Sequence, residues 1–373
     1  MGPLIFLVGC ATVQSERPSH SDCVSASEYA GPALRAPIEA SVAALRPDSI
    51  SGLSPAEQAR LRDAVERSVA ETGAISMDVA VWQAGGESFR ASHGTPDGHR
   101  HYWASVGKII TAAAVLRLEA DGLLSLNDPI SEYVDQVPNG DIITIRMLMN
   151  HTSGLFSASE DPGLQQNHGV VDLQGVLEIV QRQRPYACPG AAWRYSNTGY
   201  TLLGAVIEGV TGRPYHEAAY DLILRESAAS EVHLLGPKEP LRDIVLPAAE
   251  PGMDVRGPQA AGGALSDAGS MVLLLRDLMA CRILPQETLE LMLSELFPMH
   301  QQGLWYGLGV MVYDLPSPGG ETVWIGHSGG VPGARAIIAF APDLDAIVAV
   351  ALTGEGSAEA VANLLFSQLE PLP

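Results

Sequence analysis

Apolar residues recur with a period of two near both ends of this chain and with a helical period between them. They alternate with polar residues from Ile75 to Trp82, which predicts a β-strand, and a glycine turn leads to a return strand over 87–92. Toward the C-terminus the same alternation predicts strands over 305–313, 322–327, 334–340 and 346–352. Strands at both ends predict one antiparallel sheet built from both, flanked by helices. This is an α/β (α+β) fold with a mostly helical insertion over about 121–255.

Helix start and stop signals divide the rest of the chain. Ser54 and Glu57 form a capping box with Pro55 at the first helical position, so a helix is predicted from there to about Thr72, with Gly73 as its stop. The Ala-rich apolar run after Ser105 predicts a buried helix that ends near residues 121–122. Further helices are expected over 173–180, 201–210, 266–278 (capped by Ser266) and 357–369.

The N-terminus carries a candidate lipid-attachment site. The run from Leu7 to Cys10 resembles the lipobox of bacterial lipoproteins, in which the cysteine is acylated and becomes the mature N-terminus. We therefore expect residues 1–10 to be a signal ending at Cys10, and the protein to be lipid-anchored in the cell envelope or periplasm. The apolar run is short and no Lys or Arg precedes it. Two alternatives stay open. Either the start codon lies further upstream, or the lipobox match is due to chance and the protein is secreted or cytoplasmic. Residues 11–57 are expected to form a tether or N-terminal arm, and 58–370 the folded domain.

Composition excludes several classes of function. The chain of 373 residues has a formal net charge of −21, so no nucleic-acid partner is expected. No apolar run reaches the ~18 residues that span a bilayer, so membrane contact is expected through the lipid anchor only. His99 and His101 have no evident third ligand, and no cysteines are in Cys-x-x-Cys spacing, so neither a metal nor any other cofactor is expected. Outside the cytoplasm, two of the three remaining cysteines can form a disulfide; these are Cys23, Cys188 and Cys281.

Ser105 and Lys108 form the first chemical motif. They are three residues apart at the start of a predicted helix, which places a hydroxyl and an amine on one face. A serine hydroxyl needs a neighbouring base to become a good nucleophile, and a lysine buried among apolar residues can lose its proton and serve as that base. Only Lys108 and Lys238 among the 22 basic residues are lysines, and arginine cannot give up its proton. A titratable amine is therefore expected to be required at position 108.

Two further stretches carry polar groups suited to the same site. Tyr195 and Asn197 lie two apart before a predicted helix, where a phenol can act as general acid or base and an amide can both donate and accept. The glycine-rich run from His327 to Gly330 lies on a predicted strand, and its backbone can approach a ligand closely. A backbone N–H there, together with that of Ser105, could stabilise a tetrahedral oxyanion. Each stretch alone also fits an ordinary helix cap or hairpin turn.

Together these motifs resemble the serine β-lactamase and penicillin-binding superfamily, on the branch of class C β-lactamases, D-Ala-D-Ala carboxypeptidases and β-lactamase-like esterases. Its Ser-x-x-Lys, Tyr-x-Asn and Lys/His-Thr/Ser-Gly motifs occur here in order, at 105–108, 195–197 and 327–329. Secondary signatures match at 121–129, 148–155 and 261–263, and the similarity covers about 58–370. The resemblance implies a β-lactamase/transpeptidase-like fold and a serine hydrolase without a cofactor.

The resemblance also implies roles for individual residues. Ser105 would attack a carbonyl carbon while Lys108 and Tyr195 shuttle its proton, and Asn197 would position the substrate. The N–H groups of Ser105 and Gly330 would form the oxyanion hole, next to His327, Ser328 and Gly329 in the substrate site. His327 departs from the lysine of class C β-lactamases. Its side chain is expected to point into the cleft beside a substrate carboxylate, as a neutral imidazole that acid would convert to a cation.

Several functions share this machinery. The expected activity is that of an esterase or D-amino-acid peptidase acting on a small ester, amide or D-amino-acid peptide. A true β-lactamase and a D-Ala-D-Ala carboxypeptidase are alternatives within the same enzyme class. A non-turnover penicillin-binding receptor or scaffold is an alternative of another class, and its expected mark would be loss of Ser105, Lys108 or Tyr195. None of the three is lost.

Overall fold

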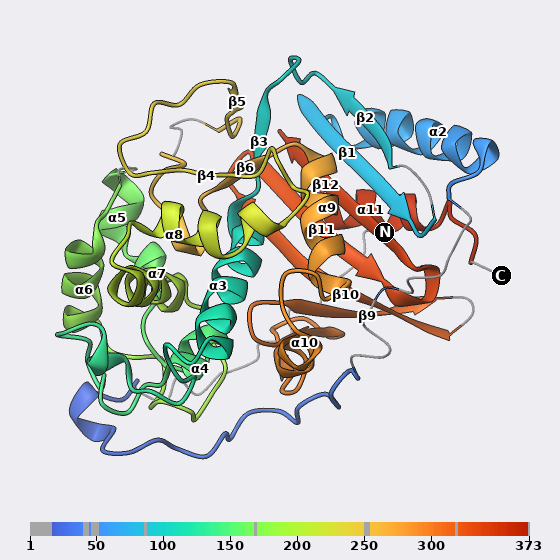
Figure 1. The fold of residues 1–373 in the computed structure, drawn as a ribbon. Coiled ribbons are helices and arrows are strands. Elements are labelled where there is room, and N and C mark those ends of the chain that lie inside the picture. The colour runs from blue at the N-terminus through green and yellow to red at the C-terminus, as the bar shows by residue number, and fades with distance from the viewer. Residues whose placement is uncertain are drawn as a thin grey trace, which may run out of the picture.

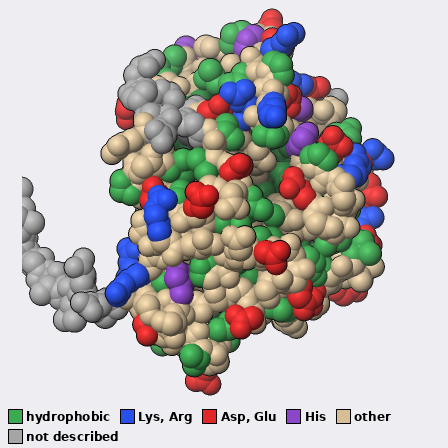
Figure 2. All heavy atoms as spheres, turned by 90° about the vertical axis from the view of Figure 1, so that its left-hand side faces the viewer, with side chains coloured by type: hydrophobic (Ala, Val, Ile, Leu, Met, Phe, Trp, Pro, Cys, Tyr) green, Lys and Arg blue, Asp and Glu red, His purple; other side chains and the backbone are tan. Residues whose placement is uncertain are grey.

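The computed structural model describes residues 17–39, 45, 52–85, 88–167, 170–249, 254–317 and 320–371 (Figure 1). The predicted signal and lipid-attachment site at Cys10 lie outside these residues, so the anchor stays a prediction. In the described part of the chain, no helix is long and apolar enough to cross a membrane. Acidic side chains are spread over the face shown in Figure 2 rather than gathered in one patch.

The predicted antiparallel sheet is confirmed. Among the described residues, eight strands follow one another in the order β2-β1-β12-β11-β10-β9-β8-β7, so that the last strand of the chain lies against the first. Their bounds are β1 Ser76–Gln83, β2 Phe89–His93, β7 Phe297–Pro298, β8 Leu304–Tyr306, β9 Met311–Ser317, β10 Gly320–Val331, β11 Ala334–Ala341 and β12 Ala346–Thr353. A smaller sheet has the order β4-β6-β3-β5, from β3 Arg100–Tyr102, β4 His233–Leu234, β5 Ile244–Val245 and β6 Ala264–Ser266.

Helices cover both faces of the large sheet (Figure 1). Because side chains alternate along a strand, Val79 and Val81 of β1 pack toward α2 and α11, while Ala80 belongs to the core on the opposite face with α9. The helices are α2 Pro55–Thr72, α3 Lys108–Ala120, α4 Ile145–Met149, α5 Pro162–Asn167, α6 Leu173–Arg182, α7 Asn197–Thr211, α8 Tyr215–Leu222, α9 Ala268–Met279, α10 Gln286–Met292 and α11 Ala358–Phe366. Helices α4 to α8 lie in the middle of the chain, where the helical insertion was predicted.

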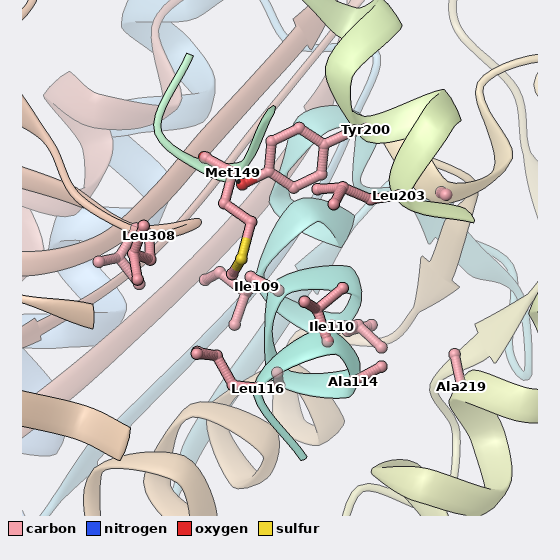
Figure 3. Packing of buried hydrophobic residues seen from close by; sticks show 14 of the residues in the cluster. Ile109, Ile110, Ala114, Leu116, Met149, Tyr200, Leu203, Ala219 and Leu308 are labelled. Atoms are coloured by element: carbon pink, nitrogen blue, oxygen red, sulfur yellow. Dashed lines mark hydrogen bonds between the residues drawn. The ribbon is translucent and has the colours of Figure 1, made fainter. Parts of the chain in front are cut away.

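Helix α3 is the centre of the core. Every residue from Lys108 to Leu116 is buried, because α7 and α8 pack against the helix on one side and the sheet on the other. Figure 3 shows Ile109, Ile110 and Leu116 of this helix with Met149, Tyr200 and Leu308 around them, each from a different part of the chain. A helix that is apolar on all sides must be buried, as the sequence predicted for this run.

Some predicted boundaries are wrong for identifiable reasons. The single strand expected over 305–313 is two strands, β8 and β9, because Gly309 interrupts it with a positive φ of 80°. A Cβ atom at Gly309 would lie 2.1 Å from the Cβ of Ala112, so the chain there must pass directly over α3. The helix expected from 266 begins at Ala268 and is capped by the Asp267 carboxylate, whereas Ser266 ends strand β6. Helix α2, with its Ser54–Glu57 capping box and Gly73 stop, lies where it was predicted.

The N-terminal arm, residues 17–39, runs along the helical region and then the large sheet (Figure 1). A disulfide joins Cys23 in this arm to Cys188, between α6 and α7, and Cys281 is a free cysteine. The sequence left this pairing open.

Two glycines of α7 should respond in opposite ways to substitution by alanine. A Cβ at Gly204 would lie 2.7 Å from the Cβ of Ala260, so Gly204→Ala should lower the free energy of unfolding by roughly 1–3 kcal/mol through overpacking. Gly209 is exposed with open space around it, so Gly209→Ala should raise that free energy by about 0.5–1 kcal/mol through helix propensity. Urea unfolding measures both, and equal effects of the two changes would contradict the packing of α7 on 259–261.

Candidate active site

Ser105 lies in a short 3-10 turn, Ala104–Gly107, that leads from β3 into α3. Ala104 has a positive φ of 47°, which is strained for a residue with a side chain. The turn is fixed by Trp103, whose backbone N–H donates to Ala264 O (3.0 Å) and whose indole N–H donates to Ser266 O (3.0 Å). Ser105 is thereby held partly exposed at the end of a buried helix.

Lys108 is fully buried, and none of its hydrogen-bond partners among the described residues is a carboxylate. Its Nζ lies 3.1 Å from Ser105 Oγ and 2.8 Å from Asn197 Oδ1, and it also donates to Ala261 O. Burial lowers the pKa of Lys108 well below its ordinary value, because removal from water disfavours the charged form of the amine. With two N–H groups engaged by Asn197 and Ala261, the neutral amine can turn its lone pair toward the Ser105 hydroxyl.

Tyr195 lies on the other side of the same amine. The centre of its ring is 5.0 Å from Lys108 Nζ, and its hydroxyl is buried without a hydrogen bond of good geometry to any described residue. Burial raises the pKa of Tyr195, and the nearby Ser105 hydroxyl lowers it by a smaller amount. The phenol is therefore protonated at neutral pH and has an unengaged hydroxyl in the site.

Asn197 begins helix α7 and uses both halves of its amide. Its Oδ1 accepts from Lys108, and its Nδ2 donates to Ser159 Oγ (2.9 Å). It therefore ties the amine to the turn Ala158–Glu160 while still lining the cavity beside Ser105.

Strand β10 lies directly against the Ser105 turn. A Cβ at Gly329 would be 2.7 Å from Ser105 N and 2.5 Å from Trp103 O, so only glycine allows this approach. The next residue, Gly330, lines the same cavity as Ser105. This places the two peptides of the predicted oxyanion hole beside one cavity.

His327 does not occupy the place that was predicted for it. It is fully buried, with Nε2 3.0 Å from the hydroxyl of Tyr306 and Nδ1 2.5 Å from Ser328 O, and it does not line the cavity. Burial lowers the pKa of His327 to about 3, a protonated Lys108 would lower it as a secondary cause, and acid near pH 5.5 therefore leaves the ring neutral. The Ser328 hydroxyl also points elsewhere, toward Met311 Sδ (3.7 Å).

A cavity of about 580 Å³ opens beside Ser105. None of the described residues that line it is Lys, Arg or His. The carboxylate of Asp254 lines it, but both oxygens are held by Arg256, at 2.8 Å from Nε and 2.5 Å from Nη2. The apolar part of the wall comprises Tyr102, Ala104, Ala158, Leu164, Val171, Val176, Ala249, Pro258, Ala261, Val331 and Pro332.

His151 is a residue of this site that the sequence reasoning missed, although its motif was noted as a family signature. Its ring lies 4.3 Å from that of Tyr195 and 4.4 Å from that of Tyr306, between centroids. Its Nδ1 accepts the backbone N–H of Ser196 (3.3 Å), and its backbone has a positive φ of 63°. Burial holds the pKa of His151 well below its ordinary value, so it packs as a neutral ring behind Tyr195.

His99 precedes strand β3 and His101 lies within it. His101 is buried and its Nε2 lies 2.9 Å from Thr95 Oγ1. Within the described ranges, no three His, Cys, Asp or Glu side chains gather as metal ligands would.

Comparison with known proteins places this geometry in a family. Penicillin-binding protein 4* of Bacillus subtilis (strain 168) is 34% identical over 120 residues, which cover 30% of this chain but only 25% of that protein. A D-stereospecific amidohydrolase from a Streptomyces species superposes with a TM-score of 0.74 at 26% identity, over 84% of this chain and 99% of that one. A D-amino acid amidase from Ochrobactrum anthropi SV3 superposes with a TM-score of 0.72 at 22% identity, over 84% and 97% of the two chains. The Beta-lactamase family model matches residues 61–369, so the chain belongs to the Beta-lactamase family.

Proposed function

We propose that this protein is a serine hydrolase that cleaves neutral esters or amides through an acyl-enzyme on Ser105. One observation carries the proposal. Lys108 is fully buried, has no carboxylate partner in the part of the chain that the structure describes, and has its Nζ 3.1 Å from the hydroxyl of the partly exposed Ser105. An uncharged amine at hydrogen-bond distance is what a serine needs to lose its proton as it attacks.

The positions of the groups support the following acylation step. Ser105 Oγ forms a bond to the carbonyl carbon of the substrate while its proton passes to Lys108 Nζ. The negative charge that develops on the carbonyl oxygen is stabilised by the backbone N–H groups of Ser105 and Gly330. When the tetrahedral intermediate collapses, the bond to the leaving group breaks and Tyr195 donates a proton to it. The phenol regains its proton from the lysine.

Deacylation uses the same groups in reverse. A water molecule gives its proton to the Tyr195–Lys108 pair as its oxygen attacks the ester carbon. Ser105 Oγ then leaves and takes the proton back. Asn197 keeps the amine in place in both halves, because its Oδ1 is 2.8 Å from Nζ.

The cavity supports neutral substrates over those with a free carboxylate. Two unit charges ~4 Å apart attract by about 4 kcal/mol at an effective dielectric near 20, and no described residue of the wall supplies a cation for that attraction. The apolar wall instead suits an uncharged alkyl or aromatic group. The amidohydrolase and the amidase among the structural relatives are named for amide-cleaving activity, which supports amides beside esters.

Ser105→Ala tests the proposal directly. The variant should stay folded, lose turnover and lose the mass increase that wild type shows on acylation by p-nitrophenyl butyrate, a D-amino acid amide or penicillin. Ser131→Ala is the matched control, because Ser131 also lies in a 3-10 turn but is exposed and does not line the cavity. Persistent labelling of another serine would contradict the assignment of Ser105 as the nucleophile.

The substrate preference is tested separately. For wild type, kcat/KM for p-nitrophenyl butyrate should exceed that for nitrocefin at pH 5.5 and at pH 8, since His327 stays neutral at both. A preference for nitrocefin would contradict the proposed preference for neutral substrates.

Lys108→Met should lower kcat by about 100-fold or more, as for a lost general base. It should also change how stability depends on pH. The pKa of Lys108 in the folded protein lies below its unfolded value, so between the two values the unfolded chain binds the extra proton and stability rises with pH. Wild type should therefore gain up to about 1.4 kcal/mol of unfolding free energy per pH unit relative to the variant. Parallel stabilities of the two proteins from pH 6 to 10 would show that Lys108 keeps its proton.

The apolar wall should set the preferred substrate size. Val171 lines the cavity and is half-buried, so Val171→Trp should place a larger side chain in the cavity. The ratio of kcat/KM for p-nitrophenyl octanoate to that for p-nitrophenyl acetate should then fall by about tenfold. Val170 is exposed and does not line the cavity, so Val170→Trp should leave that ratio unchanged. Equal ratios in the two variants would exclude this wall as the site of the apolar group.

A further inference from the structure

The segment that carries Tyr195 has no regular structure of its own. It runs from the end of α6 at Arg182 to the start of α7 at Asn197 without a helix or strand. Backbone hydrogen bonds within a helix or sheet therefore do not fix Tyr195. Its position relative to Ser105 depends on what packs against this segment from either side.

On one side lies the N-terminal arm. The disulfide joins Cys23 to Cys188, and the N–H of Ser27 donates to Pro189 O (2.8 Å). A Cβ at Gly190 would lie 2.4 Å from Ser27 O, and Gly190 has a positive φ of 85°, so only glycine fits beneath the arm.

One more bond continues this pairing, from Ala30 N–H to Ala191 O (2.9 Å). The arm therefore holds the first part of the Tyr195 segment by one covalent bond and two backbone hydrogen bonds.

On the other side lies the turn that contains His151. Thr152 O accepts the N–H of Gly190 (2.9 Å), and His151 O accepts the N–H of Arg194 (3.0 Å). The His151 ring then stacks against Tyr195 and accepts the next N–H along the chain, that of Ser196. The Tyr195 segment is thus held between the His151 turn and the arm.

The arm itself is anchored at both of its ends, so it can resist movement of what it holds. Near the disulfide, Asn139 Nδ2 donates to His20 O (2.9 Å) and Cys23 O (3.0 Å). Further along, the guanidinium of Arg35 binds both carboxylate oxygens of Asp314 in strand β9. The arm, drawn in dark blue in Figure 1, therefore braces the Tyr195 segment against both the helical region and the sheet.

We propose that the N-terminal arm, locked by the Cys23–Cys188 disulfide, is a positioning element that holds Tyr195 in line with Ser105 and Lys108. The proposal rests on the catalytic role proposed above for Tyr195. Without the disulfide, the His151 turn still contacts the segment but nothing covalent opposes its movement away from Lys108. Misplacement of a catalytic group by ~1 Å can cost on the order of 100-fold in rate.

The test compares Cys23→Ser/Cys188→Ser with wild type and with Cys281→Ser, which removes the free cysteine instead. For p-nitrophenyl butyrate, kcat of the double variant should fall about tenfold or more with little change in KM, and its pH profile should change with the position of the phenol. Amide hydrogen exchange over residues 192–196 should become faster. Cys281→Ser should match wild type in all of these measurements.

If the double variant does not fold, folded wild type reduced with dithiothreitol replaces it. The reagent passes two electrons and two protons to the disulfide to give two thiols, and is itself oxidised to its cyclic disulfide. A lower melting temperature with unchanged kcat and pH profile would overturn the proposal, since the arm would then be only a structural brace. If wild type is never acylated on Ser105, the proposed function is wrong, and the role of the arm is decided by hydrogen exchange alone. Unchanged exchange over residues 192–196 on loss of the disulfide would show that the arm does not hold the Tyr195 segment.

Discussion

The site depends on keeping one amine uncharged inside the protein. Lys108 begins a helix whose residues from 108 to 116 are all buried, and its hydrogen-bond contacts are a hydroxyl, an amide oxygen and a backbone carbonyl. A carboxylate in this place would hold the proton on the lysine and remove the proposed general base. Among the described residues the amine has polar partners but no counter-charge. Helix α7 supplies Asn197, the turn at 259–261 supplies Ala261 O, and the aromatic rings of Tyr195 and Tyr200 lie beside the amine. At pH values below the pKa of lysine in the unfolded chain, keeping this amine uncharged lowers the free energy of unfolding. The presence of an arrangement with this cost points to a chemical requirement for the amine.

Much of the fold was predictable because it is encoded locally. Alternation of apolar residues located β1, β11 and β12 to within about two residues, the usual uncertainty of element ends. The Ser54–Glu57 capping box located α2, since the cap bonds involve residues only three apart. The spacing of Ser105 and Lys108 was informative for the same reason, because one helical turn fixes their mutual distance. The juxtaposition of Tyr195 and Asn197 with that pair came from the family resemblance, not from any local signal.

What could not be predicted depends on contacts between distant parts of the chain. The orientation of His327 is decided by Tyr306 on another strand, which gives the ring a buried hydrogen-bond partner away from the cavity. The break between β8 and β9 is decided by Ala112 of α3, which Gly309 must pass closely. The partner of Cys23 is decided by the course of the arm, which brings together two cysteines with a sequence separation of 165. In each case the residue type was visible in the sequence, but its neighbour was not.

The position of strand β12 in the large sheet affects the order in which the chain can fold. Residues 346–353 lie between β1 and β11, so β1 has no partner on the side away from β2 until β12 has been synthesised. Until then β1 exposes a strand edge, and closing it requires bringing together residues such as Ser76 and Thr353. Pairings of such large sequence separation slow folding, and they leave a newly made chain open to aggregation and to helper proteins that bind unpaired strands. The large sheet can therefore close only after β12 has been synthesised, whereas α2 and the helices around α3 precede β12 in the chain and can form earlier.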